Sequence, residues 1–442
     1  MQQQFSYTDS LQNESLLSRG ASHFSNSAQN KICWRADVCK WMKFNGKKWE
    51  IVDTHIYMDI TETFSSLKKS NSSNHDYEAL SYCLDHSNYT KVETLSKPLL
   101  NIPSSMWNTN DDLLNCPNGV LDLNTGELLP HNSDHYFSMV TNAEYDQSVT
   151  FEGSQFEKFL IEIQPEKEVR EYLQMILGYS LVGRRRKKIQ IFIGGGANGK
   201  STLLNAIRHA LGDFAKVIKI DSILKIKPGS PNPDLASTVN ARFVMVTEPD
   251  RDEAINEGTI KSLTGGEPIP VRNLHENNLI LVPKFDPIIA TNYPPDIVCD
   301  DEATIRRLEP INFGVTIPTK DQNPNLNEEL IKEASIVLKW LFDGYRKAQA
   351  TEGKLDTPAF LQKNLDEFIF QNSPEFRFIE EECKIDQDAS IPVSDINDAY
   401  YHFCTSTGLP FRPRALPKRL SKMSITQSRT GKTRFYNGIK LK

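Results

Sequence analysis

A glycine-rich stretch that ends in lysine and serine is the clearest chemical signal in the sequence. Residues 194–201 read GGGANGKS and satisfy the pattern G-x-x-x-x-G-K-[ST]. Between a strand and a helix, such a loop surrounds a β-phosphate with backbone N–H groups. Lys200 would reach the β- and γ-phosphates, and the Ser201 hydroxyl would bind Mg²⁺, so we expect ATP and Mg²⁺ as cofactors. The predicted nucleotide-binding residues are Gly194, Gly195, Gly196, Ala197, Asn198, Gly199, Lys200, Ser201 and Thr202.

Two further polar residues directly follow apolar runs that are typical of buried strands. Glu248 follows residues 242–247, and Asn292 follows residues 287–291. A carboxylate at the tip of a strand beside the phosphate-loop strand can polarise the attacking water or help to hold the metal. Glu248 is therefore the predicted catalytic acid and Mg²⁺ contact, alone or with Asp250, and the alternative is an ordinary surface glutamate. The Asn292 amide can orient the lytic water.

Two groups of basic residues flank this region. Arg306 and Arg307 precede another predicted strand, LEPINF (308–313). The planar, permanently charged fork of arginine suits a transferring phosphoryl group, whereas an arginine pair taken alone is more simply a solvated surface. The basic run 184–188 precedes the first strand and is expected to be a solvated lead-in, with DNA contact as the alternative.

The elements that must position these residues alternate between strand and helix from Lys187 to about Phe313. A helical pattern begins after Lys200, and four short, continuous apolar runs are the predicted strands. This alternation indicates a three-layer α/β domain with a largely parallel sheet. The predicted strands are residues 189–193, 242–247, 279–282 and 287–291.

The segments on either side have different patterns. Residues 65–76 are a predicted loop, and residues 116–131 predict small hairpins because Pro-Asn-Gly and Asn-Thr-Gly flank an alternating run. Residues 156–181 predict two helices separated at Pro165, and residues 325–349 predict one amphipathic helix. From Ser373 onward, two helices followed by a basic hairpin around Thr430-Gly431 are typical of a winged helix-turn-helix.

Composition narrows the class of protein. The 442 residues are 38% hydrophobic and 24% charged, without an apolar run of 18 or more, which excludes a spanning helix. The N-terminus has no secretory pattern, and seven scattered cysteines form no CxxC pair, so we expect reduced thiols in a cytoplasm. Residues 405–442 carry ten Lys/Arg and no Asp/Glu, which leaves 41 basic against 57 acidic residues, or −16, in the rest of the chain. A basic tail of this kind can bind nucleic acid or be a solvated face.

The order of the motifs resembles a known family. Between Lys200 and Arg307 lies KSLTGGEPI (261–269), followed by VRNLH (271–275). This arrangement resembles the superfamily 3 helicases of viruses and mobile elements. More narrowly, it resembles the phage/plasmid primase–helicase family, which includes the poxvirus-type primase-helicases. PNGVLDLNTGEL and GKTRFYNGIKL are similar to flanking segments of that family. The resemblance covers nearly all of the chain and predicts the helicase portion, without the primase domain that lies upstream in the family.

The resemblance implies both a fold and a division of the chain. The fold is a P-loop AAA+-like three-layer α/β ATPase core with an α+β N-terminal region and a small winged-helix-like C-terminal domain. We expect an accessory or collar region at 1–150, the ATPase domain at 151–350, and the basic C-terminal domain at 373–442.

The resemblance also implies roles for particular residues. Arg307 would be an arginine finger for a neighbour's nucleotide, with Arg306 as the alternative finger, and Lys261 would lie at the same subunit interface. A hairpin lining a central channel would contact DNA through Arg272 and His275, although His275 fits an ordinary loop histidine too. Lys284 is a weaker match for the same role. The residues assigned to catalysis are Lys200, Glu248, Asn292 and Arg307.

The function implied is an ATP-dependent DNA helicase that replicates a phage, plasmid or mobile element as a ring oligomer, expected to be a hexamer. Its partners would be single-stranded or forked DNA and a primase or polymerase, with no membrane, in the host cytoplasm. The alternative is an origin-binding initiator or scaffold whose ATPase controls assembly only. A P-loop nucleotide kinase explains neither KSLTGGEP nor Asn292.

Overall fold

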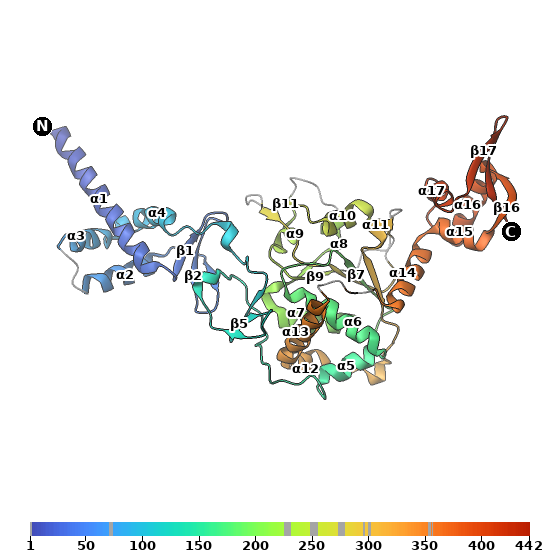
Figure 1. The fold of residues 1–442 in the computed structure, drawn as a ribbon. Helices are drawn as coiled ribbons and strands as arrows, with labels where there is room; N and C mark the ends of the chain where they lie inside the picture. The colour runs from blue at the N-terminus through green and yellow to red at the C-terminus, as the bar shows by residue number, and fades with distance from the viewer. Residues whose placement is uncertain are drawn as a thin grey trace.

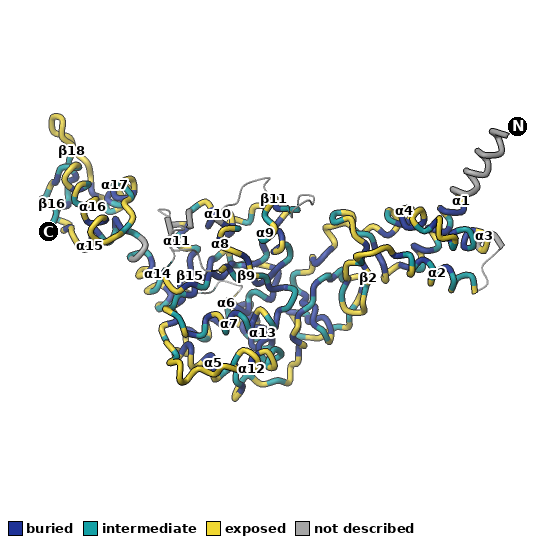
Figure 2. Tube along the Cα trace, turned by 180° about the vertical axis from the view of Figure 1, so that it is seen from behind, coloured by how far each residue is buried: buried dark blue, intermediate teal, exposed yellow. Residues whose placement is uncertain are grey.

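A computed structural model describes residues 2–69, 74–224, 231–247, 255–272, 279–294, 297–298, 302–351, 355 and 357–442. Figure 1 shows three parts in a row, with the N-terminal elements at one end, a central α/β part, and a small C-terminal part at the other end. None of the helices within these ranges is long and apolar enough to cross a membrane. The buried residues are concentrated in the central part (Figure 2).

The N-terminal part combines four helices with a three-stranded antiparallel sheet. The helices are α1 (Gln2–Ala28), α2 (Tyr57–Lys69), α3 (Asn74–Cys83) and α4 (Tyr89–Leu99), and the sheet contains β1 (Ile32–Arg35), β2 (Lys40–Phe44) and β3 (Trp49–Val52). Phe24, Phe64 and Leu80 are fully buried in a core of their own. The predicted loop at 65–76 is wrong for residues 65–69, which belong to α2, and for residues 74–76, which begin α3, and residues 70–73 lie outside the described ranges.

A second antiparallel sheet connects this part to the centre. It contains β4 (Leu113–Cys116), β5 (Gly119–Asp122) and β6 (Leu128–Leu129), so the predicted hairpins are confirmed. Leu114, Leu121 and Leu123 pack in the same core as the helices that follow residue 150. This sheet therefore packs on the central part rather than on the N-terminal helices.

The central sheet has five parallel strands in the order β15-β7-β13-β9-β8, which confirms the predicted α/β architecture. The strands are β7 (Ile189–Ile193), β8 (Ala215–Ile218), β9 (Phe243–Val246), β13 (Ile288–Thr291) and β15 (Leu308–Asn312). Phe192 and Ile311 point into a core on one face, whereas Ile191 and Leu308 point into a core on the other. Side chains alternate between the faces of a strand, so the sheet is the middle layer of three.

One predicted strand belongs elsewhere. Residues 279–282 were expected in the parallel sheet, but β12 (Leu279–Leu281) pairs antiparallel with β11 (Ile269–Val271) in a two-stranded sheet. Ile280 and Val282 are 57% and 50% exposed, so this apolar run has an exposed face that a central strand would not have. A further two-stranded sheet is parallel and contains β10 (Ile255–Asn256) and β14 (Ile297–Val298).

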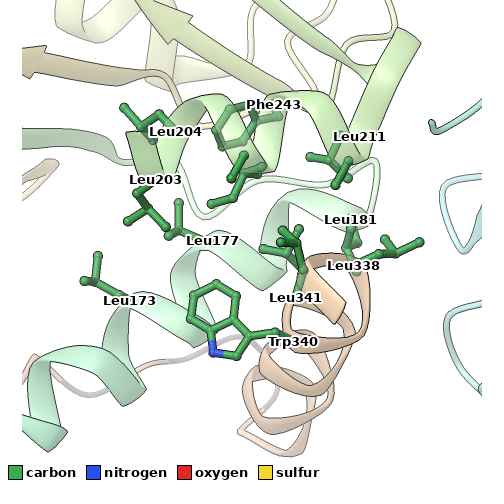
Figure 3. Packing of buried hydrophobic residues seen from close by; sticks show 14 of the residues in the cluster. Leu173, Leu177, Leu181, Leu203, Leu204, Leu211, Phe243, Leu338, Trp340 and Leu341 are labelled. Carbon is green, nitrogen blue, oxygen red and sulfur yellow. The ribbon is translucent and has the colours of Figure 1, made fainter. Parts of the chain in front are cut away.

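Helices cover both faces of the central sheet. One face carries α5 (Gln155–Ile163), α6 (Lys167–Gly178), α7 (Lys200–Leu211), α12 (Leu326–Lys332) and α13 (Ala334–Ala350), and Figure 3 shows leucines of α6, α7 and α13 in one cluster with Phe243 and Trp340. The other side has α8 (Ile220–Leu224), α9 (Pro233–Ser237), α10 (Glu257–Gly265) and α11 (Glu302–Ile305). The two helices predicted within 156–181 are confirmed.

The single helix predicted at 325–349 is two helices, and the break has a function in the fold. Glu333 separates α12 from α13, and its carboxylate accepts hydrogen bonds from the backbone of Gln155 and Phe156 at 3.0 and 2.8 Å. Those N–H groups at the start of α5 have no partner inside that helix. Glu333 therefore caps a helix that lies far away in the sequence.

The C-terminal part begins beyond α14 (Ala359–Asn372), which packs along the edge strand β15. It contains α15 (Pro374–Glu382), β16 (Cys383–Pro392), α16 (Val393–Thr407), α17 (Ala415–Lys422), β17 (Thr426–Thr430) and β18 (Thr433–Leu441). Its sheet is antiparallel in the order β16-β18-β17, over a separate core that includes Phe378, Tyr400 and Leu416. The predicted order of helix, helix and hairpin is confirmed, and α15 and β16 are additional.

Candidate active site

The glycine-rich loop joins β7 to α7 in a compact turn. Gly196, Ala197 and Gly199 have left-handed φ angles of +100°, +49° and +76°. A Cβ on Gly199 would lie 2.3 Å from Ile163 Cγ2, so any side chain there would collide with α5. Glycine is required at this position by both its backbone angle and its neighbour.

Lys200 lies at the first position of α7 and is 5% exposed. Its Nζ donates hydrogen bonds to Gly194 O at 2.6 Å and to Asn198 Oδ1 at 2.9 Å. The ammonium group is thus held at the mouth of the loop, beside the N-terminus of a 12-residue helix. Both features favour an anion at this point.

The loop and Asn292 share one cavity of about 230 Å³, lined by residues 196–202 and by Ala290, Thr291 and Asn292. The two segments meet because β13 lies beside β7 in parallel, with Thr291 opposite Ile193. The structure therefore brings Lys200, Ser201 and Asn292 together, as the sequence predicted. A larger cavity of about 730 Å³ lies between α5, α6 and α13, away from this chemistry, and ion-paired side chains such as Lys339–Asp343 line it.

Glu248 and Asp250 lie outside the described residues, and only the strand that leads to Glu248 can be placed. Thr247 N donates to Ile218 O at 3.0 Å at the carboxyl end of β9. The prediction that this strand lies beside the phosphate-loop strand is wrong, because β13 separates β9 from β7. Glu248 therefore follows a strand two places away from the loop, with the Asn292 strand between them.

Arg306 and Arg307 precede β15, at the amino edge of the sheet. β15 and β7 run parallel, with Leu308 opposite Ile189 and Asn312 opposite Ile193. The glycine-rich loop follows Ile193, so Arg307 and the loop are separated by the length of a five-residue strand, about 16 Å. Arg307 therefore lies at the opposite end of the strands from the loop of its own chain.

Helix α10 lies next to Arg307. The Arg307 guanidinium donates from Nη1 to Thr264 Oγ1 at 2.7 Å. Lys261, one turn earlier in α10, pairs with Glu257 and is 48% exposed. Of the two predicted interface residues, Lys261 therefore lies on α10 and Arg307 contacts the same helix.

The predicted DNA-contacting residues are only partly brought together. Arg272 follows β11, and its carbonyl accepts from Asn232 N at 3.0 Å, whereas His275 lies outside the described residues. Lys284 follows β12, but its Nζ donates to Asp111 Oδ1 at 2.6 Å and pairs with that carboxylate. This ion pair with the segment before β4 argues against the predicted DNA contact of Lys284.

The basic run 184–188 is only in part the predicted solvated lead-in, because Arg184 and Lys187 are exposed whereas the Arg186 side chain belongs to a buried network. The Arg186 side chain is 5% exposed and donates to both carboxylate oxygens of Glu309, at 3.0 and 2.5 Å. Asp286 accepts from the backbone N–H groups of Arg186 and Lys188, and burial raises the pKa of its carboxyl. Lys188 Nζ donates to Arg306 O at 2.7 Å. The run therefore joins β7 to the segment that carries the two candidate finger arginines.

Arg242 is a second buried cation that the sequence analysis missed. It precedes β9 and donates to the carbonyls of Leu181, Asn110 and Leu113 at 2.5, 3.1 and 2.9 Å. Burial lowers the pKa of its guanidinium to about 10. Arg242 thus connects the β4–β6 sheet to the strand that leads to Glu248. Its three partners lie 61 to 132 positions away in the sequence, so no local pattern predicts them.

Comparisons with known proteins agree with this organisation. Residues 21–165 match the family model described as "D5 N terminal like", and residues 192–307 match a family of unknown function, DUF5906. The chain is 34% identical over 211 residues to "Putative helicase L207/L206" of Acanthamoeba polyphaga mimivirus, which covers 46% of this chain and 22% of that protein. It is 24% identical over 246 residues to "Putative primase C962R" of African swine fever virus (isolate Warthog/Namibia/Wart80/1980), which covers 53% of this chain and 25% of that protein.

The fold also has a counterpart among solved structures. The apo C-terminal region (residues 305–718) of NrS-1 superposes with a TM-score of 0.50 at 12% identity, over 92% of this chain and 96% of that one. The chain spans about a quarter of the length of the two viral relatives. The five-stranded parallel sheet makes the central part an α/β fold. The chain is thus similar to D5-like primase-helicase proteins of large DNA viruses.

Proposed function

We propose that this chain is an ATP-dependent DNA helicase for the replication of a virus, phage, plasmid or other mobile element, and that it acts as a ring oligomer, a hexamer. The observation that carries the proposal is the cavity shared by the glycine-rich loop and Asn292. The family relationship supports it, because relatives are named as helicases and primases of large DNA viruses. The division into a collar at 1–150, an ATPase at 151–350 and a basic domain at 373–442 is part of this proposal.

The residues around the loop fit an ATP–Mg²⁺ group. Glycine is required at Gly194 because a Cβ there would lie 2.1 Å from Asn198 Nδ2 and 2.5 Å from Phe313 O. Lys200 would hold the β- and γ-phosphates, and the Ser201 hydroxyl would contact the metal. When bound, Mg²⁺ would neutralise charge that develops on the phosphates. Glu248 would activate the attacking water, and the Asn292 amide would orient it.

The position of Arg307 supports an active site that is shared between subunits. Arg307 lies a strand's length from the loop of its own chain, about 16 Å away. In a ring it would reach the γ-phosphate held by the next subunit, and Lys261 on α10 would lie in the same interface. Arg306, which is exposed, is the alternative finger.

Two regions are proposed to contact DNA. Arg272, which follows β11, and His275, which lies between β11 and β12 in the sequence, would grip a single strand inside the ring. The 373–442 domain, winged-helix-like in its order of elements, would bind from outside through α17. Arg414, Lys418 and Lys422 are exposed and spaced four residues apart, so they lie along one face of the helix.

The test is strand displacement on a forked DNA substrate with ATP and Mg²⁺. We expect displacement by the wild-type chain and none by Lys200→Ala. The second candidate function is an origin-binding initiator whose ATPase controls assembly, and the basic face of α17 favours it. An initiator of that kind would bind duplex DNA and hydrolyse ATP without displacing a strand.

A further inference from the structure

Arg185 lies in the basic run before β7, and its side chain turns away from the sheet towards α10. Its Nη1 donates to Leu263 O at 2.6 Å. Leu263 lies in the last turn of α10, where carbonyl groups lack partners within the helix. A guanidinium at a helix C-terminus satisfies such a carbonyl and is stabilised by the helix dipole. Arg185 therefore caps the end of α10.

Gly266, the residue that follows α10, leaves space for the Arg185 side chain. Gly266 has a left-handed φ of +97°, and an added Cβ would lie 2.8 Å from Arg185 Nη2. The second glycine of KSLTGGEP thus provides both the turn that ends α10 and the space for the guanidinium. The nucleotide chemistry described above uses neither residue.

The last turn of α10, which Arg185 caps, also contacts Arg307 through Thr264. Thr264 is the residue after Leu263, and its Oγ1 donates to Ile260 O at 2.5 Å while it accepts from Arg307 Nη1 at 2.7 Å. Arg185 fixes the peptide that precedes Thr264, and Thr264 fixes the direction of the Arg307 guanidinium. This makes a continuous path of contacts from Arg185 to the candidate finger.

The backbone of the finger is held by the same stretch of chain. Lys188 Nζ donates to Arg306 O at 2.7 Å, and Ile189 N donates to Arg307 O at 2.8 Å. Residues 185–189 therefore fix Arg307 from two sides, through its peptide group and through Thr264. A side chain held this way loses its direction when one of its supports is removed.

We propose that Arg185 is a positioning residue that orients Arg307 towards the ATP of the neighbouring subunit. This inference rests on the proposed function, in which Arg307 acts in trans. Because small misplacements of a catalytic group can be costly, removing Arg185 should lower kcat on the order of 10- to 100-fold. The KM for ATP should change little, because Arg185 lies at the opposite edge of the sheet from the loop of its own chain.

The test is a set of mixing experiments with Arg185→Met, which keeps the apolar stem of the side chain and removes its donors. Mixed with Lys200→Ala, it should regain ATP turnover, since some interfaces then combine an intact loop with an intact finger side. Mixed with Arg307→Ala, it should regain none, because both defects lie on the finger side. Arg185→Lys, which retains a donor, should recover part of kcat.

Arg184→Met is the matched control, because Arg184 belongs to the same run but pairs with Asp112 at 2.8 Å. It should keep the wild-type kcat. A wild-type kcat for Arg185→Met, or rescue by Arg307→Ala, would overturn the inference. If Arg185→Met does not assemble, Thr264→Val takes its place: the same mixing pattern supports the path through Thr264, and any other pattern overturns it. If Lys200→Ala and Arg307→Ala co-assemble without regaining activity, the trans finger itself fails, which is a separate result.

Discussion

Lys200 donates hydrogen bonds to Gly194 and Asn198, two members of the loop that carries it. Such a geometry depends on residues that are neighbours in the sequence, and this is why the motif predicted the position of Lys200 correctly. Asn292 could also be predicted, because parallel strands end at the same edge of a sheet.

Replacing Lys200 with Ala should abolish ATP turnover, because the loop then lacks its cation for the β- and γ-phosphates. The measurement is phosphate release at saturating ATP, with thermal unfolding to show that the fold is retained. Lys167→Ala is the control, since this lysine is 80% exposed on α6 and should leave turnover unchanged. Turnover by Lys200→Ala at the control rate would contradict the assignment of the loop.

Arg186 shows why other residues could not be predicted. Its partner Glu309 lies 123 positions away, on a strand that the sequence places only by its apolar pattern. From the sequence alone, five basic residues in a row are equally consistent with a solvated surface. Only the fold brings Glu309, Asp286 and Tyr172 to this run.

At the scale of elements, the sequence predicted β7, β9 and β13 of the central sheet because each is a continuous apolar run. β8 was missed because its four residues include Lys216 and only Ala215 and Ile218 are buried. β12 was assigned to the wrong sheet, because an apolar run of four residues does not reveal whether one of its faces is exposed. The break at Glu333 was missed because helical spacing continues across it.

The edge strand β15 is held by the Arg186–Glu309 pair, whose side chains are 5% and 3% exposed. Glu309→Ala should lower the free energy of unfolding by about 3–5 kcal/mol, because it removes the carboxylate that takes both hydrogen bonds from a buried arginine and leaves only Asp286, at 3.7 Å, as its charge partner. Chemical denaturation measures this change. Glu367→Ala is the control, since it removes an exposed i,i+4 pair with Lys363 and should cost at most about 1 kcal/mol. Equal effects of the two variants would contradict the role of the buried pair.

The exposed face of α17 should contribute to DNA binding through phosphate contacts. Replacing Arg414, Lys418 and Lys422 with Ala should reduce the slope of log K against log salt by up to about 3 for duplex DNA. The measurement is a titration of binding at several salt concentrations. The control removes the same charge from Lys158, Lys167 and Lys363, which are exposed outside this domain. A loss of slope in the control alone would assign the DNA contact to another surface.

For the whole molecule, the loop and Arg307 lie at opposite edges of one sheet, and this separation predicts how defective subunits behave together. Lys200→Ala and Arg307→Ala should each be nearly inactive, because an arginine finger contributes ~10³–10⁵-fold where it has been measured. A mixture should regain ATP turnover at interfaces that pair an intact loop with an intact finger.

The mixture is compared with each parent at the same total concentration, and co-assembly is checked with differently tagged subunits. Parental activity in a co-assembled mixture would show that Arg307 does not act in trans. Repeating the mixture with Arg306→Ala would then test the neighbouring arginine.

The close packing of α6 against α13 has a consequence for biosynthesis. A Cβ on Gly344 would lie 2.0 Å from Gln174 O, and Leu338 and Leu341 are fully buried in the core that also contains Phe192 and Ile311. A nascent chain that has emerged as far as Phe313 has all five strands of the sheet, yet one face still lacks the helix that seals it. That face remains a target for chaperones and proteases until about residue 350 has left the ribosome, so the central part completes its core only after its last strand has been made.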